Sequence, residues 1–286
     1  MMSGRRVVSR LSAVGLVATC TVVANGPSAQ QLPLEPTRDS GQSVTAAYEG
    51  WYPNPDGTYT LLVGYFNRNQ KQALDIPIGP DNRIEPGGPD RGQPTHFLPR
   101  RQWGVFTIRV PADFAGKKLT WTLVANDKPT EVPMSLDPLW LLEPLKDAAK
   151  GNTPPTVRFE PDGTGFQGPP SGFAASLGGV FPDPVTLTVW AADDAIVDAY
   201  RSGRPGPPVT LTWSKFRGPG GVSFADRKPP VDPKDQKATT TATFTEPGEY
   251  VLRLQANDVS GEGGGGSQCC WTNAHVKVDV KPRSRQ

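Results

Sequence analysis

The sequence predicts an all-β protein built from two β-sandwich domains, and three observations support this. The 286 residues include 32 prolines and 31 glycines, which break helices and suit turns between short strands. Several stretches alternate apolar and polar residues with a period of two, which is typical of half-buried strands. Turn-forming residues separate these stretches at the spacing of a sandwich, and the length suits two domains of ordinary size.

The N-terminus has the order of a bacterial secretory signal. Arg5, Arg6 and Arg10 precede an apolar run over residues 11–24, and small residues follow up to Ala29. The run is shorter than the roughly 20 residues that span a bilayer, and no later stretch is long and apolar enough. We therefore expect export of a chain without a transmembrane span to the periplasm, cell surface or medium. Residues 1–29 would be the signal peptide, cleaved after Ala29 or after Ala24.

Cys20 is a candidate lipidation site within this signal. The segment Val17-Ala18-Thr19-Cys20 resembles the bacterial lipobox, although Thr19 stands where that pattern has Gly, Ala or Ser. A lipid anchor on Cys20 is thus an alternative to simple cleavage. The following residues, 30–43, are polar and lack periodicity, which predicts a disordered leader.

The charge of the chain disfavours nucleic acid and anionic membrane surfaces as partners. The full sequence has 30 basic and 28 acidic residues. Loss of the three signal-peptide arginines leaves 27 basic against 28 acidic residues, a net charge of −1. No element gathers lysines and arginines as a phosphate backbone requires.

The first domain is predicted over residues 44–135. Asn54-Pro55-Asp56-Gly57 predicts a hairpin turn, so residues 48–52 and 59–66 should pair as antiparallel strands. Residues 79–92 are rich in proline and glycine and predict a long loop. Further strands are expected at 103–110 and 118–125. Residues 136–151 are interpreted as a connector with one or two helical turns in 139–150.

The second domain is predicted over residues 152–282. Its alternating strands are expected near 185–189, 209–213, 239–245, 250–256 and 274–280. Trp213 lies in the middle of one strand, as a core residue of an immunoglobulin-like sandwich does. Tyr250 follows Pro247-Gly248-Glu249 at the start of the penultimate strand, where its hydroxyl can bond back to the main chain as a tyrosine corner.

This second domain resembles the PKD-like domains of the polycystic kidney disease and REJ-related group. The resemblance rests on residues 211–215 (LTWSK), 218–220 (GPG), 241–244 (TATF), 247–254 (PGEYVLRL) and 256–258 (AND). It departs from the family at insertions over 195–208 and 228–237 and at the loop 261–271. The resemblance implies a β-sandwich that spaces or presents other domains and sometimes contacts protein or polysaccharide. Residues 44–135 resemble only exported bacterial proteins of undefined activity, through their Asn54–Gly57 turn and residues 64–69.

The chain offers little for catalysis. Its two histidines are His96 and His275, and no Gly-x-Ser-x-Gly elbow is present, so we predict no catalytic residues. Cys269 and Cys270 with His275 are a candidate zinc or copper site, but neighbouring strand residues point to opposite faces, and His275 is expected on the solvent face of the last strand. A disulfide, within the chain or to another chain, and free thiols are the alternatives.

Two further groups of residues are candidate binding sites. Carboxylates at strand ends, Asp193, Asp194 and Asp258, are candidate calcium ligands, although such residues commonly serve turns; no other cofactor is expected. Aromatic and polar residues of the first domain are a candidate ligand face for sugar or peptide: Trp51, Tyr52, Asn67, Arg68 and Asn69.

These observations predict a non-catalytic exported protein of the cell envelope that acts in binding, adhesion or scaffolding. Its partner is expected to be an envelope protein or a polysaccharide. The alternatives are a carbohydrate-binding accessory protein and a Cys/His metal or redox protein.

Overall fold

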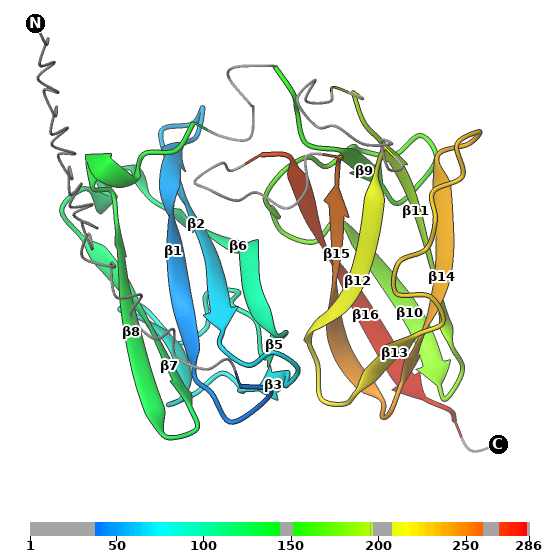
Figure 1. The fold of residues 1–286 in the computed structure, drawn as a ribbon, viewed down its shortest axis with the longest axis horizontal. Coiled ribbons are helices and arrows are strands. Elements are labelled where there is room, and N and C mark those ends of the chain that lie inside the picture. Colours follow the sequence, from blue (N-terminus) through cyan, green and yellow to red (C-terminus); the bar gives the residue numbers. More distant parts are fainter. Residues whose placement is uncertain (1–37, 144–150, 195, 197–207, 260–268, 285–286) are drawn as a thin grey trace, which may run out of the picture. The chain divides into compact units, whose positions relative to one another are not determined.

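The computed structural model describes residues 38–143, 151–194, 196, 208–259 and 269–284, and the regular secondary structure of these residues is almost entirely β-strand (Figure 1). Residues 37–286 form one compact unit. The predicted signal peptide, with Cys20, lies outside the described residues. In the described part of the chain, no helix is long and apolar enough to cross a membrane.

The first sandwich packs two three-stranded antiparallel sheets against each other. One sheet has the order β1-β2-β6, the other β4-β7-β8, and a short pair, β3-β5, lies beside them. The strands are β1 (Val44–Pro53), β2 (Tyr59–Asn67), β3 (Leu74–Asp75), β4 (Asn82–Glu85), β5 (His96–Phe97), β6 (Arg100–Val110), β7 (Lys118–Ala125) and β8 (Lys128–Ser135). Phe106 of β6 meets Trp121 of β7 edge to face at 5.1 Å, so the two sheets share one aromatic core.

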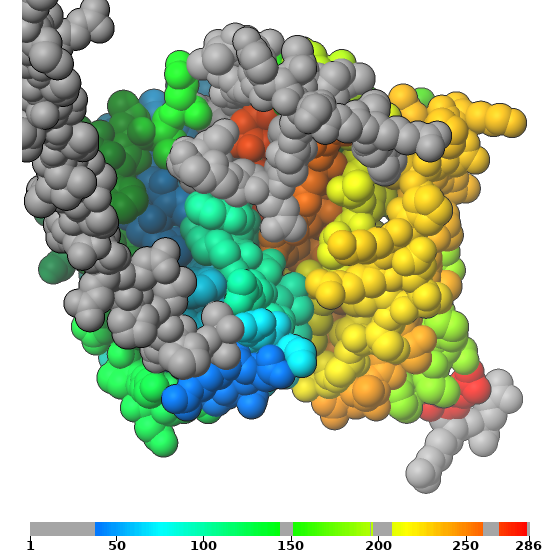
Figure 2. Space-filling model, in the orientation of Figure 1, coloured from blue at the N-terminus to red at the C-terminus, as the bar shows by residue number. Residues whose placement is uncertain are grey.

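The second sandwich also has two sheets, ordered β10-β16-β15-β12 and β13-β14-β11-β9. Its strands are β9 (Thr156–Arg158), β10 (Ala175–Phe181), β11 (Val185–Ala192), β12 (Thr210–Arg217), β13 (Val222–Phe224), β14 (Lys237–Phe244), β15 (Gly248–Asn257) and β16 (Trp271–Pro282). Strand β10 runs parallel to β16, whereas all other pairs are antiparallel. Figure 2 draws all atoms in the same view, with the colours of this sandwich running from green through yellow and orange to red.

The two immunoglobulin-like features predicted in the second domain are present. Trp213 is 1% exposed in the core between the sheets. The Tyr250 hydroxyl donates to the carbonyl of Glu246 at 2.7 Å and accepts from Gly220 N at 3.1 Å, which is the hydrogen bonding of a tyrosine corner. The structure therefore confirms two immunoglobulin-like β-sandwiches in tandem.

The hairpin predicted around Gly57 is confirmed, with Tyr52 opposite Thr60 and Ala46 opposite Tyr65. The long loop predicted over 79–92 is wrong in part, because β4 lies within it and pairs with β7. Asn82 explains this strand: its buried side-chain amide donates to the carbonyls of Ile76 and Pro94, and its oxygen accepts from Trp121 Nε1. One polar side chain thereby fixes a segment whose composition favours a loop.

The disordered leader predicted over 30–43 is wrong for residues 38–43. Backbone N–H groups of the segment after β2 donate to Arg38, Asp39 and Ser43, at 2.9 to 3.1 Å. These residues therefore belong to the first sandwich. Pro138–Trp140 forms a 3-10 turn in the predicted connector, and residues 144–150 lie outside the described part.

Candidate functional site: the contact between the two sandwiches

The outward-facing side chains of β15 and β16 are polar, yet they are buried. Arg253, Gln255, Asn273 and His275 are 1 to 7% exposed. Their alternation with core residues predicts a solvent face, and the prediction that His275 faces solvent is wrong. Strand β6 of the first sandwich lies against this face, so both faces of the two strands are covered.

Strand β6 carries a bulge where it meets the second sandwich. Val63 of β2 lies opposite Phe106 and Tyr65 lies opposite Gln102, so residues 103–105 of β6 have only Gly64 across from them. Gly104 adopts φ +48°, a conformation that glycine accepts more readily than other residues. A β-bulge turns the main chain out of its regular pairing with the neighbouring strand. The bulge of β6 directs main-chain carbonyls towards the second sandwich.

A buried carboxylate holds the bulge from inside the first sandwich. Glu49, itself the extra residue at an irregularity of β1, accepts from Gly104 N with both oxygens, at 2.9 and 3.0 Å. Arg101 donates to the same carboxylate at 2.8 Å. Burial raises the pKa of Glu49, while Arg101 and the Gly104 amide act in the opposite direction. Gly64 leaves the room that this carboxylate occupies, because a Cβ there would overlap it.

Three side chains of the second sandwich bind the same bulge from outside. Asn273 Nδ2 donates to the carbonyls of Gly104 at 2.9 Å and of Trp103 at 3.2 Å. His275 Nε2 lies 3.0 Å from the carbonyl of Val105. Because a carbonyl can only accept, Nε2 carries the proton of the neutral ring. Arg253 joins the network through Asn273 Oδ1 at 2.8 Å and Gln102 Oε1 at 3.0 Å.

The close approach of strands β6 and β16 at the bulge requires glycine at position 104. A Cβ on Gly104 would overlap the ring of Trp271, the first residue of β16. Trp271 is fully buried, so it has no free space into which its ring could move. The absence of a side chain at Gly104 therefore allows the ring of Trp271 to pack against the bulge.

Strand β12 makes the second part of the contact. Phe216 belongs to the hydrophobic core cluster of the first sandwich, and its carbonyl accepts from Thr95 N. Its ring packs against that of His275 in a tilted arrangement, with the ring centres 4.2 Å apart. Arg217 forms a two-pronged ion pair with Asp90, at 2.7 and 3.0 Å. Lys215, only 7% exposed at its side chain, donates to Asp75 at 3.0 Å. Strand β12 thus holds the first sandwich both through the buried ring of Phe216 and through the ion pairs of Arg217 and Lys215.

Burial sets the protonation of His275. Loss of solvent lowers its pKa to about 3, and the neighbouring Arg253 acts in the same direction. His275 is therefore neutral at physiological pH. Burial also lowers the pKa of His96, against the opposing effect of Asp75, which lies 2.9 Å from Nδ1.

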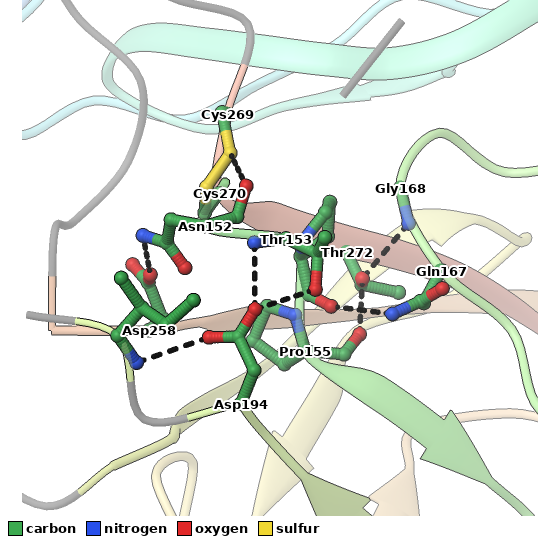
Figure 3. Close-up of a disulfide and its surroundings, with 12 residues drawn as sticks. Asn152, Thr153, Pro155, Gln167, Gly168, Asp194, Asp258, Cys269, Cys270 and Thr272 are labelled. Atoms are coloured by element: carbon green, nitrogen blue, oxygen red, sulfur yellow. Dashed lines mark hydrogen bonds between the residues drawn. A yellow bond between two sulfur atoms is a disulfide. The ribbon is translucent and has the colours of Figure 1, made fainter. Parts of the chain in front are cut away.

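Cys269 and Cys270 are joined by a disulfide at the start of β16 (Figure 3). The Cys269 sulfur lies 3.5 Å from the carbonyl of Asn152, at the entry to the second sandwich. Thr272 donates to the carbonyl of Pro155 at 2.5 Å and accepts from Gly168 N at 2.9 Å. The disulfide thus sits where the domain entry, the loop at Gly168 and β16 meet.

The candidate zinc or copper site of Cys269, Cys270 and His275 is not formed. Both sulfurs are in the disulfide and lack the thiolate that binds such metals, and the His275 proton on Nε2 is directed at Val105. Across the described residues, no three histidine, cysteine, aspartate or glutamate side chains gather as metal ligands.

The carboxylates suggested as calcium ligands hold the ends of strands together. Asp194 accepts from Thr153 N and Oγ1 at 2.9 and 2.7 Å, and from Ile196 N at 3.1 Å (Figure 3). Partial burial acts to raise the pKa of Asp194, but these hydrogen bonds outweigh it and lower the pKa. Asp258 accepts from Asn152 Nδ2 at 2.7 Å, and Asp193 directly follows β11. The bonds of Asp194 and Asp258 are those of loop and turn residues.

The proposed ligand face of Trp51, Tyr52, Asn67, Arg68 and Asn69 is not a single surface. Asn67 and Asn69 are fully buried and bond each other and the nearby loop. Trp51 and Tyr52 pair near the other end of β2, opposite Leu61 and Thr60. Six residues of strand separate the two groups, about 20 Å. A face that combines all five residues is therefore excluded.

Comparison with protein-family models and with curated proteins gave no match. Solved structures similar to the chain include the PKD domain of the KIAA 1837 protein, 21% identical, with a TM-score of 0.24 over 39% of this chain and 85% of that chain. A tandem of titin immunoglobulin domains is 11% identical, with a TM-score of 0.24 over 85% of this chain and 100% of that chain. A domain of intimin is 10% identical, with a TM-score of 0.26 over 83% of this chain and 99% of that one.

Proposed function

We propose that this chain is a non-catalytic, exported module of the bacterial cell envelope that binds or scaffolds other molecules, and that its two sandwiches act as one rigid body. The observation that carries the proposal is the bulge of β6, which Glu49 holds from one side and Asn273, His275 and Arg253 bind from the other. This contact between the two sandwiches, which we call the joint, keeps surfaces on the two domains at a constant distance and orientation.

The chemistry of the contact supports rigidity. Loosely linked domains commonly meet through small, solvated surfaces and move relative to each other. Here each sliding motion would leave a buried amide, imidazole or guanidinium without its acceptor, and a buried polar group without a partner costs about 1–3 kcal/mol. Phe216 would also have to leave an apolar core. Both costs favour a single arrangement.

The positions of the histidines support a non-catalytic role. His275 is buried and bonds a main-chain carbonyl, and His96 bonds Asp75. A general base needs a ring nitrogen within reach of a nucleophile or substrate. Both rings instead hold strands and loops in place. The export signal that the sequence predicts in residues 1–29 supports the envelope location.

Fractionation combined with crosslinking in intact cells tests this proposal. The full chain, tagged at its C-terminus, is expected in the envelope fraction and crosslinked to one recurring partner, a protein or a polysaccharide. Gly104→Ala, which loosens the joint, should reduce that crosslink. Gly116→Ala is the matched control, since Gly116 also has a positive φ, +76°, but an added Cβ would meet no atom within 4 Å.

Three results would each overturn part of the proposal. Recovery of the processed chain in the cytoplasm would remove the envelope location. Turnover of a substrate by the purified chain would remove the non-catalytic role. An unchanged crosslink in Gly104→Ala would show that binding does not need the rigid joint.

A further inference from the structure

The second sandwich contains a cavity of about 580 Å³ between β11 and β10. Thr186, Leu187 and Thr188 of β11 form one wall, and residues 174–177 at β10 form the other. Three aromatic residues line it as well: Phe159, Phe166 and Trp213. Its volume falls within the range of ligand-binding clefts, roughly 300–1,000 Å³.

One wall of this cavity is an open sheet edge. Strand β11 pairs with β14 over Val185–Trp190, but on its other side it pairs with β9 only over Trp190–Ala192. Strand β9 is short because the chain turns after Arg158 and returns to pair Phe166 with Val157. From Val185 to Val189, β11 thus has no neighbouring strand on the cavity side among the described residues.

The direction of the main-chain groups on this edge follows from one hydrogen bond. Ala191 N donates to Gln236 O beside β14, so the N–H and C=O groups of odd-numbered residues face β14. Because these groups alternate along a strand, those of Thr186 and Thr188 face the cavity. The two residues are about 7 Å apart, which is the two-residue repeat of an extended chain.

The remaining lining indicates which strand would fit. A strand added beside β11 would turn alternate side chains inward, towards Phe159, Phe166 and Trp213, where apolar groups are favoured. Glu160, the charged residue of the lining, favours a basic residue in the same segment.

We infer that this cavity is a β-augmentation site, in which an extended peptide segment of a partner protein pairs with Thr186 and Thr188 of β11. The segment has apolar residues at alternate positions and a flanking lysine or arginine. This inference rests on the proposed binding function and names its partner class as protein. A sugar would use the aromatic rings, but it does not match two amide and carbonyl pairs at the strand repeat.

Amide NMR on the full chain tests the site with defined probes. The probe is a mixture of acetylated heptapeptides Lys-Thr-X-Thr-X-Thr-Lys, in which X is Val, Leu, Ile or Phe. In an antiparallel pairing, the threonine N–H groups of the peptide face β11 while X points inward. We expect the amide signals of Thr186 and Thr188 to shift and to exchange more slowly with D₂O. The same peptides N-methylated at threonine should cause neither effect.

A matched pair of variants tests the edge from the side of the protein. Thr186→Pro removes the N–H that faces the cavity, and proline is tolerated where a strand edge is open. It should bind the peptides roughly tenfold more weakly, the effect of about one hydrogen bond. Thr186→Val keeps the N–H and should bind as the wild type does. Because the N-methylated peptides remove the same bonds without changing the protein, the test holds even if Thr186→Pro folds poorly.

Two outcomes would overturn the inference. One is an absence of shifts at Thr186 and Thr188 at millimolar peptide. The other is a shift of these signals by a hexasaccharide such as maltohexaose or chitohexaose but not by the peptides. Either result leaves the crosslinking test of the proposed function unaffected, so the two failures are distinguishable.

Discussion

Mild acid is expected to destabilise this protein through His275. Burial lowers the pKa of His275 to about 3 in the folded chain, whereas an unfolded histidine titrates near 6.5. Between these values the unfolded chain binds a proton that the folded chain does not. The free energy of unfolding therefore falls as pH drops below 6.5 and levels off near pH 3.

The size of this effect follows from the pKa difference. Between pH 6.5 and pH 3, each pH unit lowers the free energy of unfolding by up to about 1.4 kcal/mol. A change from pH 6.5 to pH 5 therefore lowers it by about 2 kcal/mol. This is a large part of the 5–15 kcal/mol that stabilises a typical domain. The loss falls on the contact between the sandwiches, because His275 bonds Val105 there.

Urea unfolding at pH 7 and pH 5, followed by tryptophan fluorescence, measures the effect against a variant. His275→Gln keeps a donor for the Val105 carbonyl but does not titrate, so it should lose about 2 kcal/mol less than the wild type on acidification. His96→Gln is the control: its difference from the wild type reports His96 alone, and it should retain the contribution of His275. Equal losses in wild type and His275→Gln would show that His275 does not cause the acid destabilisation.

Three further variants test the joint and the fold. Gly104→Ala should destabilise the chain by about 1–3 kcal/mol more than Gly116→Ala in urea unfolding, because only the first places a methyl group against Trp271; equal losses would contradict the close approach. Arg253→Met should lower the free energy of unfolding by about 1–3 kcal/mol, since its bonds to Asn273 and Gln102 are lost; an unchanged midpoint would count against the network. Tyr250→Phe should cost about 1 kcal/mol through the lost tyrosine corner, measured by thermal unfolding, and a stabilised variant would contradict that role.

Much of the fold follows from the sequence, because alternation reports directly on burial within one sandwich. The hairpin at Gly57, the strand over 118–125 and the core position of Trp213 all follow from residues within a few positions of each other. Short strands leave a weaker signal in the sequence, because they contain too few residues to show an alternation. Strand β4 forms because Asn82 bonds the carbonyls of Ile76 and Pro94, and a single asparagine among prolines and glycines gives no periodic signal.

The contact between the sandwiches could not be predicted from the same signals. Arg253 and His275 alternate with core residues, and this pattern is the same whether water or another domain covers the outer face. Glu49 and Gly104 lie 55 positions apart and meet only through two strand irregularities. A sequence clue exists in retrospect: a tryptophan, an asparagine and a histidine stand close together on β16, which is an unusual set for a solvated face.

Residual dipolar couplings of backbone amides in the weakly aligned full chain test the central claim, that the two sandwiches form one rigid body. If the two sandwiches move together, a single alignment tensor fits the couplings of β1–β8 and of β9–β16. In Gly104→Ala, the two sets should require separate tensors, whereas Gly116→Ala should behave as the wild type. Separate tensors for the two sandwiches of the wild-type chain would show that the sandwiches move independently.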